Sequence, residues 1–183
     1  MNTFAPGINL VSEVGIFIGI GGNLPSERFG PLPETLRAAV AALPQHGVKP
    51  LRQSRWYRSA PVPASDQPWF LNAVVAVATS LEPAELLGVL HEIENEFGRR
   101  RRQRWEARPL DLDLLDHGGR IEAGTVRLPH PRLHERAFVL LPLKEVAPTW
   151  IHPESGLGID QLCARLNPNH VARPWDEEGD TST

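Results

Sequence analysis

The stretch GRRRRQRWEARPLDLDLL, residues 98–115, ends in a run that alternates leucine with aspartate. Successive side chains of a β-strand point to opposite faces of its sheet, so this alternation predicts a strand with leucines on a buried face. Asp111 and Asp113 then lie together on the other face. Because unpaired buried charge is costly, the two carboxylates need cations close by.

Arginine side chains and divalent metal ions are the two kinds of cation that could meet this need. Mg²⁺ prefers one or two carboxylates together with substrate phosphates, and guanidinium groups bind phosphate oxygens through paired hydrogen bonds. Trp105 could stack on a base. The stretch therefore favours a site for a nucleoside triphosphate, with six arginines available to it: Arg99, Arg100, Arg101, Arg102, Arg104 and Arg108.

The same residues also have interpretations without catalysis. Two aspartates separated by one residue are common by chance, and they could simply end the strand in a salt bridge with Arg108. An arginine run alone is more typical of a solvated patch that binds RNA or an anionic membrane. An RNA-binding ferredoxin-like module is therefore a second hypothesis, although the net charge is −3 and the strands lack the exposed aromatic pattern of RNA-recognition sheets.

Composition indicates one soluble globular domain. The chain has 183 residues, of which 41% are hydrophobic and 22% charged. Its one cysteine, Cys163, excludes an intramolecular disulfide and fits a reducing cytoplasm. No apolar run approaches the roughly 18 residues needed to cross a membrane. We expect an N-terminal arm at 1–13, the domain at 14–166 and a C-terminal tail at 167–183, in a cytoplasmic monomer without nucleic-acid or membrane partners.

Hydrophobic periodicity and turn signals predict an α+β fold. Leu86, Leu90, Ile93 and Phe97 recur at helical spacing, and Gly98 is a natural helix stop. The order strand–helix–strand–strand–helix–strand matches a ferredoxin-like βαββαβ core with an antiparallel sheet and a C-terminal extension. The expected strands are 14–20, 48–57, 70–79 and 110–115, and the expected helices are 33–43, 83–97 and, in the extension, 137–146.

Other polar and aromatic residues interrupt this pattern. His130 lies between two prolines in PHPR, which indicates either a fixed position in a site or a capped loop histidine. Asn72 is the polar exception in a buried strand, so its amide either binds the backbone or reads the edge of a ligand. Phe70 and Phe138 belong either to the core or to the walls around a flat heterocycle.

Six segments together resemble the 6-hydroxymethyl-7,8-dihydropterin pyrophosphokinase family of folate biosynthesis. No single segment is decisive, but all six occur in the order found in the family. They are IGIGGNL (18–24), WYRSAPV (56–62), DQPWFLNAVVAVATSL (66–81), LLGVLHEIENEFGRRR (86–101), RWEARPLDLDLL (104–115) and LPHPRLHERAFVLLPLKEVAP (128–148).

The resemblance implies a specific reaction and a specific set of site residues. Diphosphate passes from ATP, the co-substrate, to the hydroxymethyl group of the dihydropterin, giving the pterin diphosphate and AMP. Asp111 and Asp113 would hold two Mg²⁺ ions, and Arg99, Arg108 and His130 would complete the catalytic set. The implied ATP-binding residues are His91, Arg99, Arg101, Arg104, Trp105, Arg108, His130 and Arg136, with Glu94 facing the same site. The implied pterin-binding residues are Ser59, Ala60, Val62, Phe70, Asn72 and Phe138.

One departure from the family pattern bears on the reaction. Glu106 stands where the family usually has glycine, and a carboxylate beside a triphosphate is unfavourable unless it points to solvent or pairs with an arginine. A third hypothesis follows: a relative that binds ATP but has lost catalysis.

Overall fold

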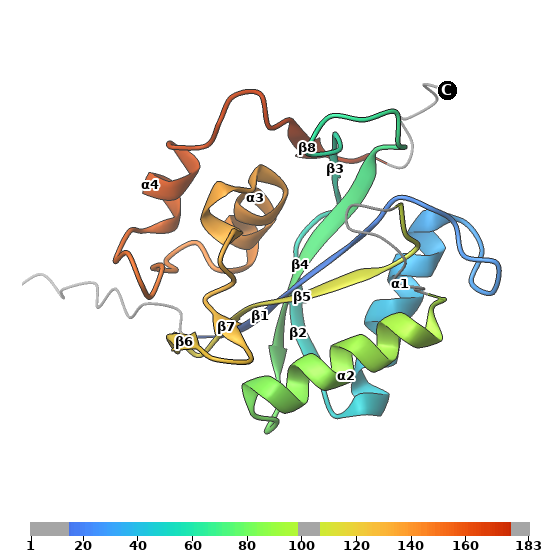
Figure 1. Ribbon diagram of the computed structural model, residues 1–183, viewed down its shortest axis with the longest axis horizontal. Helices are drawn as coiled ribbons and strands as arrows, with labels where there is room; N and C mark the ends of the chain where they lie inside the picture. The colour runs from blue at the N-terminus through green and yellow to red at the C-terminus, as the bar shows by residue number, and fades with distance from the viewer. Residues whose placement is uncertain (1–14, 99–106, 177–183) are drawn as a thin grey trace, which may run out of the picture.

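The computed structural model describes residues 15–98 and 107–176, which fold around one six-stranded sheet (Figure 1). Every strand pair in it is antiparallel. In sheet order the strands are β5 (Asp111–His117), β1 (Ile16–Gly22), β4 (Phe70–Ala78), then β2 (Lys49–Gln53) and β3 (Tyr57–Ser59), which both pair with β4, and finally β8 (Ala172–Pro174) beside β3.

Two helices complete the predicted βαββαβ core. Helix α1 (Leu32–Ala42) lies between β1 and β2 in the chain, and α2 (Pro83–Glu96) lies between β4 and β5. Strand β4 lies between β1 and β2 in the sheet, so the connection through α1 passes over one strand. Strand β1 lies between β4 and β5, so the connection through α2 does the same. This is the ferredoxin-like arrangement, and the α+β prediction with an antiparallel sheet is confirmed.

Local sequence accounts for the bounds of α2. The Glu82 N–H donates to Glu85 Oε2 at 2.9 Å, which forms half of a capping box, and Pro83 occupies the first turn, where its missing N–H is harmless. After the helix, Gly98 has a φ of +87°, a conformation that glycine adopts without strain. The long helix therefore begins where the sequence predicts and ends one residue before its predicted end.

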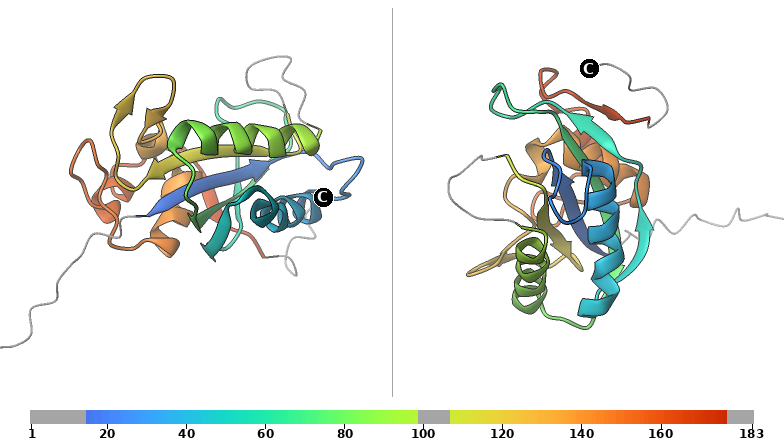
Figure 2. Two further views of the ribbon diagram at one scale, coloured as in Figure 1. Left: turned by 90° about the horizontal axis from the view of Figure 1, so that it is seen from below. Right: turned by 90° about the vertical axis from the view of Figure 1, so that its right-hand side faces the viewer.

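The two faces of the sheet bury different clusters of side chains. Leu110, Leu112 and Leu114 belong to the cluster beneath α1 and α2, as the alternation predicts. On the other face, Phe17 and Leu115 pack against α3 (Ala137–Val146) and α4 (Ile159–Cys163). Figures 1 and 2 show α1 and α2 together on one side of the sheet and α3 on the other. Asp111 and Asp113 face the α3 side.

The edge strand expected at 48–57 is two strands separated by a break. Pro50 lies opposite Val77, and the register shifts between Pro50 and Arg52, because proline cannot donate to the ladder. In the break, the Ser54 N–H donates to the Val74 carbonyl at 3.0 Å, and Ser54 Oγ accepts from the Val74 N–H at 3.0 Å. A serine side chain thus replaces the missing ladder bond.

Strand β1 extends to Gly22, two residues past its predicted end at Ile20. Gly21 and Gly22 belong to the strand, and their neighbours leave no room for a side chain at either position. A Cβ on Gly21 would lie 2.5 Å from Asn72 Oδ1, and one on Gly22 would collide with the Pro109 carbonyl oxygen. The two glycines therefore allow close packing at this end of β1.

The C-terminal region contains more structure than the sequence predicts. β8 lies within the stretch 167–183 that we expected to be a tail, and α4 lies in a region without a clear periodic pattern. Within the described residues, no helix is long and apolar enough to cross a membrane. The remaining elements are η1 (Leu43–His46), the hairpin of β6 (Glu122–Ala123) and β7 (Arg127–Leu128), and η2 (Leu133–Glu135).

Candidate active site

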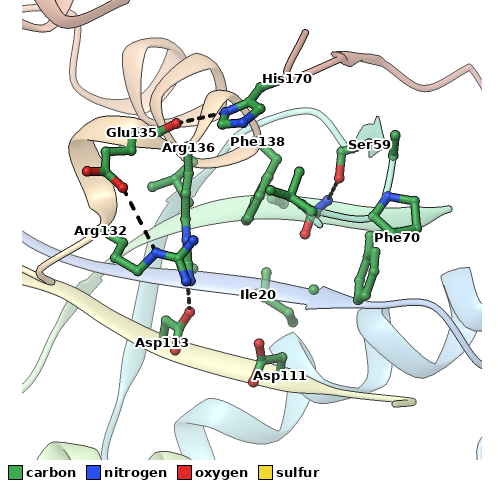
Figure 3. Close-up of a pocket in the computed structure, with 18 of the residues that line it drawn as sticks. Ile20, Ser59, Phe70, Asp111, Asp113, Arg132, Glu135, Arg136, Phe138 and His170 are labelled. Atoms are coloured by element: carbon green, nitrogen blue, oxygen red, sulfur yellow. Dashed lines mark hydrogen bonds and ion pairs between the residues drawn. The ribbon is translucent and has the colours of Figure 1, made fainter. Parts of the chain in front are cut away.

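A cavity of about 340 Å³ lies over the α3 face of the sheet (Figure 3). Strands β1, β3, β4 and β5, the start of α3 and the chain near His170 all contribute to its lining. Many of the predicted site residues meet there although they are far apart in the sequence. They are Ser59, Ala60, Val62, Phe70, Asn72, Arg108, Asp111, Asp113, His130, Arg136 and Phe138.

Glycines of the central strand form part of the cavity floor. Gly21 pairs with Asn72 of β4 on one side and with Asp111 of β5 on the other, and Gly19 pairs with Asp113. Because neither glycine has a side chain, a ligand can approach the sheet between the amide and the carboxylates. The glycine-rich end of β1 thus separates two chemically different halves of the cavity.

The acidic half is formed by two carboxylates, each paired with an arginine. Asp111 Oδ2 lies 2.8 Å from Arg108 Nη2, and Asp113 Oδ2 lies 3.4 Å from Arg136 Nη1. Figure 3 shows both carboxylates on the side of β5 that faces Arg136 and Phe138. The predicted salt bridge with Arg108 is therefore present at the start of β5, and both of its residues line the cavity.

The donor set of this half fits Mg²⁺ bound together with substrate. In the described part of the chain, no group of three or more acidic, histidine or cysteine side chains could hold a metal alone. Two neighbouring carboxylates suit an ion that takes its other ligands from phosphates and water. Within the same residues, Arg108 Nε is buried without a hydrogen-bond partner, which a phosphate oxygen would supply.

His130 is held in one orientation by its neighbours. The His130 backbone N–H donates to the Leu115 carbonyl at 2.8 Å, and the ring Nδ1 accepts from the Arg132 backbone N–H at 3.2 Å. Burial lowers the pKa of His130 below its usual value of 6.5, and the nearby Asp113 carboxylate opposes this shift. The imidazole is therefore neutral near pH 7 and carries its proton on Nε2, from which it can donate to a ligand.

Arg136 links the acidic half to the start of α3. Burial lowers the pKa of its guanidinium, while Asp113 acts in the opposite direction. An arginine remains charged at any physiological pH, so Arg136 is a fixed cation in a partly desolvated wall. Its Cζ lies 5.5 Å from the centre of the Phe138 ring, a cation–π contact that orients both side chains.

The other half of the cavity presents an amide between aromatic residues. Asn72 Nδ2 donates to Ser59 Oγ at 2.9 Å, and both side chains are buried. Because the amide nitrogen is oriented by Ser59, the Asn72 carbonyl oxygen is presented as an acceptor. Phe70 on β4 and Phe138 on α3 also line the cavity. A flat heterocycle with N–H donors on one edge fits this half.

Several predicted residues lie elsewhere. His91 is on α2 and is absent from the described lining of the cavity. Glu94 is buried beside β5, where its Oε1 accepts from the Leu112 N–H at 2.7 Å. The predictions for Arg99, Arg101, Arg104, Trp105 and Glu106 fall outside the described residues.

Sequence reasoning missed other residues of the lining. Gln67, Arg132, Glu135 and His170 all contribute to it. His170 reaches the cavity from the expected tail, and its Nδ1 lies 3.2 Å from the Glu135 carbonyl oxygen (Figure 3). No periodicity marks His170, which only a short edge strand places, whereas the position of Arg132 within the PHPR motif was a usable signal.

Comparison with known proteins identifies the family. Residues 17–148 match the model for 7,8-dihydro-6-hydroxymethylpterin-pyrophosphokinase, which is more than half of the chain. The chain belongs to this pyrophosphokinase family. The match includes both aspartates, Asn72, His130 and Phe138, so the predicted site residues that meet in the cavity all lie in the part shared with the family, whereas His170 lies beyond it.

Several relatives support the assignment over most of their length. The 2-amino-4-hydroxy-6-hydroxymethyldihydropteridine pyrophosphokinase of Synechocystis is 41% identical over 155 residues, which are 84% of this chain and 76% of the relative. The Bacillus subtilis pyrophosphokinase is 45% identical over 71% of this chain and 76% of its own. The pyrophosphokinase of Methylorubrum extorquens is 38% identical over 86% of this chain and 96% of the relative.

Solved structures of the pyrophosphokinase family share the fold. A crystal structure of Plasmodium falciparum HPPK-DHPS superimposes with a TM-score of 0.61 at 13% identity. The match covers 81% of this chain and 42% of that longer protein. At this identity the likeness supports the fold alone, and it agrees with the ferredoxin-like sheet described above.

Proposed function

We propose that this chain transfers diphosphate from ATP to the hydroxymethyl group of 6-hydroxymethyl-7,8-dihydropterin, a step of folate biosynthesis. Membership of the pyrophosphokinase family supports this reaction. One structural observation carries it further: arginine-paired carboxylates share one cavity with a buried amide and two aromatic rings, and glycines of β1 lie between the carboxylates and the amide. The cavity can therefore hold a polyphosphate and a heterocycle next to each other.

In this proposal the acidic half binds the triphosphate. Asp111 and Asp113 would hold two Mg²⁺ ions, which neutralise charge on the transferring group when bound. Arg108 and Arg136 bind phosphate oxygens, since each guanidinium already lies beside one of the carboxylates. His130 donates from Nε2 to a phosphate oxygen. These cationic and neutral donors stabilise the charge that shifts toward the leaving AMP.

The amide half binds the pterin. The Asn72 carbonyl accepts from the N–H groups on one edge of the ring, while Phe70 and Phe138 contact its two faces. Ala60 and Val62, beside Ser59, line the same end of the cavity. In this pose the hydroxymethyl oxygen points toward the glycine floor and the triphosphate. That oxygen then attacks the β-phosphorus of ATP and loses its proton to solvent, while the bond from the β-phosphorus to the α-phosphate oxygen breaks and AMP leaves, with no covalent intermediate on the protein.

A product analysis tests the function directly. The purified chain is incubated with Mg²⁺, ATP and the hydroxymethyl dihydropterin, and the nucleotide products are resolved by chromatography. We expect AMP that depends on the pterin. ADP would instead indicate transfer of a single phosphate, and ATP binding without either product would favour the relative that has lost catalysis.

We further propose that the chain acts in the cytoplasm as a monomer on small molecules only. The single cysteine supports the compartment, and a cavity that brings the predicted residues for both substrates together within one chain supports the monomer. Sedimentation of the purified chain at the concentrations of the assay tests the oligomeric state, and a dimer there would contradict the proposal.

A further inference from the structure

Asn23 joins three strands at the edge of the cavity. It follows the last residue of β1, the strand between β4 and β5, and only 3% of its surface is exposed. Its side-chain amide forms hydrogen bonds toward both neighbours, to segments that are 44 to 85 residues away in the sequence. A buried asparagine with all these bonds formed is a rigid connection.

On the β5 side, Asn23 holds the backbone of Arg108. The Asn23 N–H donates to the Arg108 carbonyl at 2.9 Å, and the Asn23 Oδ1 accepts from the Arg108 N–H at 2.9 Å. The ladder between β1 and β5 ends at the pair of Gly21 and Asp111, so the asparagine side chain continues the pairing beyond it. This fixes the residue whose guanidinium lies 2.8 Å from Asp111.

On the β4 side, the same amide holds the chain that leads into Phe70. Asn23 Nδ2 donates to the Pro68 carbonyl at 3.1 Å and to Gln67 Oε1 at 3.3 Å. Pro68 lies two residues before Phe70 and four before Asn72, both of which line the cavity. One side chain therefore connects the segment with Arg108 to the segment with Phe70.

We propose that Asn23 is a positioning residue that sets the distance between the two substrates, an inference that rests on the function proposed above. The chain segments it joins carry Arg108, on the nucleotide side, and Phe70, on the pterin side. Transfer requires the attacking oxygen and the phosphorus to approach within about 3–3.5 Å, and a misplacement of about 1 Å can slow a reaction ~100-fold. Binding of either substrate alone does not depend on that distance.

The predicted signature is a loss of rate without a comparable loss of affinity. In Asn23→Ala, the single-turnover rate at saturating substrates falls at least ~10-fold, because the two halves are no longer held in register. The dissociation constants of the pterin alone, and of a non-hydrolysable ATP analogue with Mg²⁺ alone, change less than ~3-fold. A residue needed only for folding would change both affinities together with the melting temperature.

A second variant separates the two connections. Asn23→Asp keeps an acceptor for the Arg108 N–H but replaces the amide donor with an oxygen facing the Pro68 carbonyl. It is therefore expected to lose rate although the Arg108 connection is intact. Gln67→Ala removes only one of the two β4-side contacts and is expected to retain more of the rate than either Asn23 variant.

Asn167→Ala is the matched control. Asn167 Oδ1 accepts from the Asn169 N–H at 2.9 Å in an exposed turn outside the cavity lining of the described residues. Its loss should leave the single-turnover rate within ~2-fold of the wild type, as for most surface substitutions.

The measurements separate this inference from the proposed function. Absence of pterin-dependent AMP in the wild type would overturn the function and the inference together. AMP formation by the wild type, with unchanged rates in both Asn23→Asp and Asn23→Ala, would overturn the inference alone. The inference is supported if the rate falls in both variants while each substrate still binds. Should Asn23→Ala fail to fold, Asn23→Asp and Gln67→Ala give the same discrimination.

Discussion

Asp113 illustrates how a single residue carries the chemistry of the cavity. Its carboxylate lies 3.4 Å from Arg136 and on the same strand face as Asp111. In Asp113→Ala we expect turnover to fall at least ~100-fold, because one carboxylate cannot position metal and triphosphate as two do. Steady-state AMP formation measures the loss. Retained activity would contradict the metal assignment.

The control for Asp113 is a carboxylate outside the cavity. Asp160 is exposed on α4 and lies 2.5 Å from Lys144. Asp160→Asn should retain wild-type turnover, because exposed ion pairs contribute little and this one touches no part of the site. Circular dichroism of both variants separates loss of chemistry from loss of fold.

Tyr57 offers a spectroscopic test at the residue scale, because it is the only tyrosine in the sequence. Burial first, and then the hydrogen bond to Glu145 Oε1 at 2.6 Å, raise its pKa to about 12. Ultraviolet titration of the folded chain should therefore show phenolate well above the usual value of 10.0, and Glu145→Gln should move the midpoint partly back. A midpoint near 10 in the folded wild type would contradict the burial of this hydroxyl.

At the scale of elements, the same glutamate connects α3 to the sheet. Glu145 accepts from the Tyr57 hydroxyl, from the Arg55 N–H at 2.9 Å and from the Arg55 guanidinium at 2.6 Å. Glu145→Ala leaves the buried Tyr57 hydroxyl without this partner, which costs about 1–3 kcal/mol. Denaturant unfolding measures the loss. Tyr57→Phe is the matched comparison. It removes the hydroxyl itself, so no buried donor is left without a partner, and its cost should be smaller.

The turn after α3 makes stability depend on pH. Burial lowers the pKa of His152 below 6.5, and its Nδ1 accepts from the Ser155 N–H at 3.1 Å. A group with a lowered folded pKa contributes stability that is present above the unfolded pKa and is lost as the pH falls through the folded pKa. The unfolding free energy should therefore fall as the pH drops below about 6.5. His152→Asn, which retains an acceptor, should weaken this dependence.

Asp116, near His152, contributes to the pH dependence of stability in the opposite sense. Burial raises its pKa above 3.8, against the effect of the hydrogen bond from Trp150 Nε1 at 2.8 Å. Its contribution is present at low pH and is lost as the pH rises through the folded pKa. Asp116 is present in both proteins, so the difference between wild type and His152→Asn, measured from about pH 8 to below pH 6.5, isolates the effect of His152. No difference between wild type and His152→Asn in that range would contradict this account.

For the whole molecule, the sequence predicted the βαββαβ core because each element has a strong local period. The alternation around Asp111 fixed which face carries the carboxylates, since a strand has a period of two. The break at Ser54 was hidden because a serine side chain, not the backbone pattern, replaces the ladder bond there. β8 was hidden because its three residues have no period of their own and owe their pairing to β3.

The residues of the cavity divide in the same way, into those with a local sequence signal and those without one. Residues on strands and at helix starts, such as Asn72 and Arg136, could be expected in it from their motifs. His170 could not be expected there, nor could the contacts of Asn23 beside the cavity, because both depend on segments distant in the sequence. Tertiary hydrogen bonds of this kind leave no periodic signal, and only the arrangement of the folded chain reveals them.

The most direct test of the account is phosphorus NMR of the complete reaction. The chain, Mg²⁺, ATP and the hydroxymethyl dihydropterin are mixed and followed to completion. The account predicts the two coupled resonances of a pterin diphosphate together with the single resonance of AMP. The resonances of ADP and a pterin monophosphate would contradict the central claim that two phosphates move as one group.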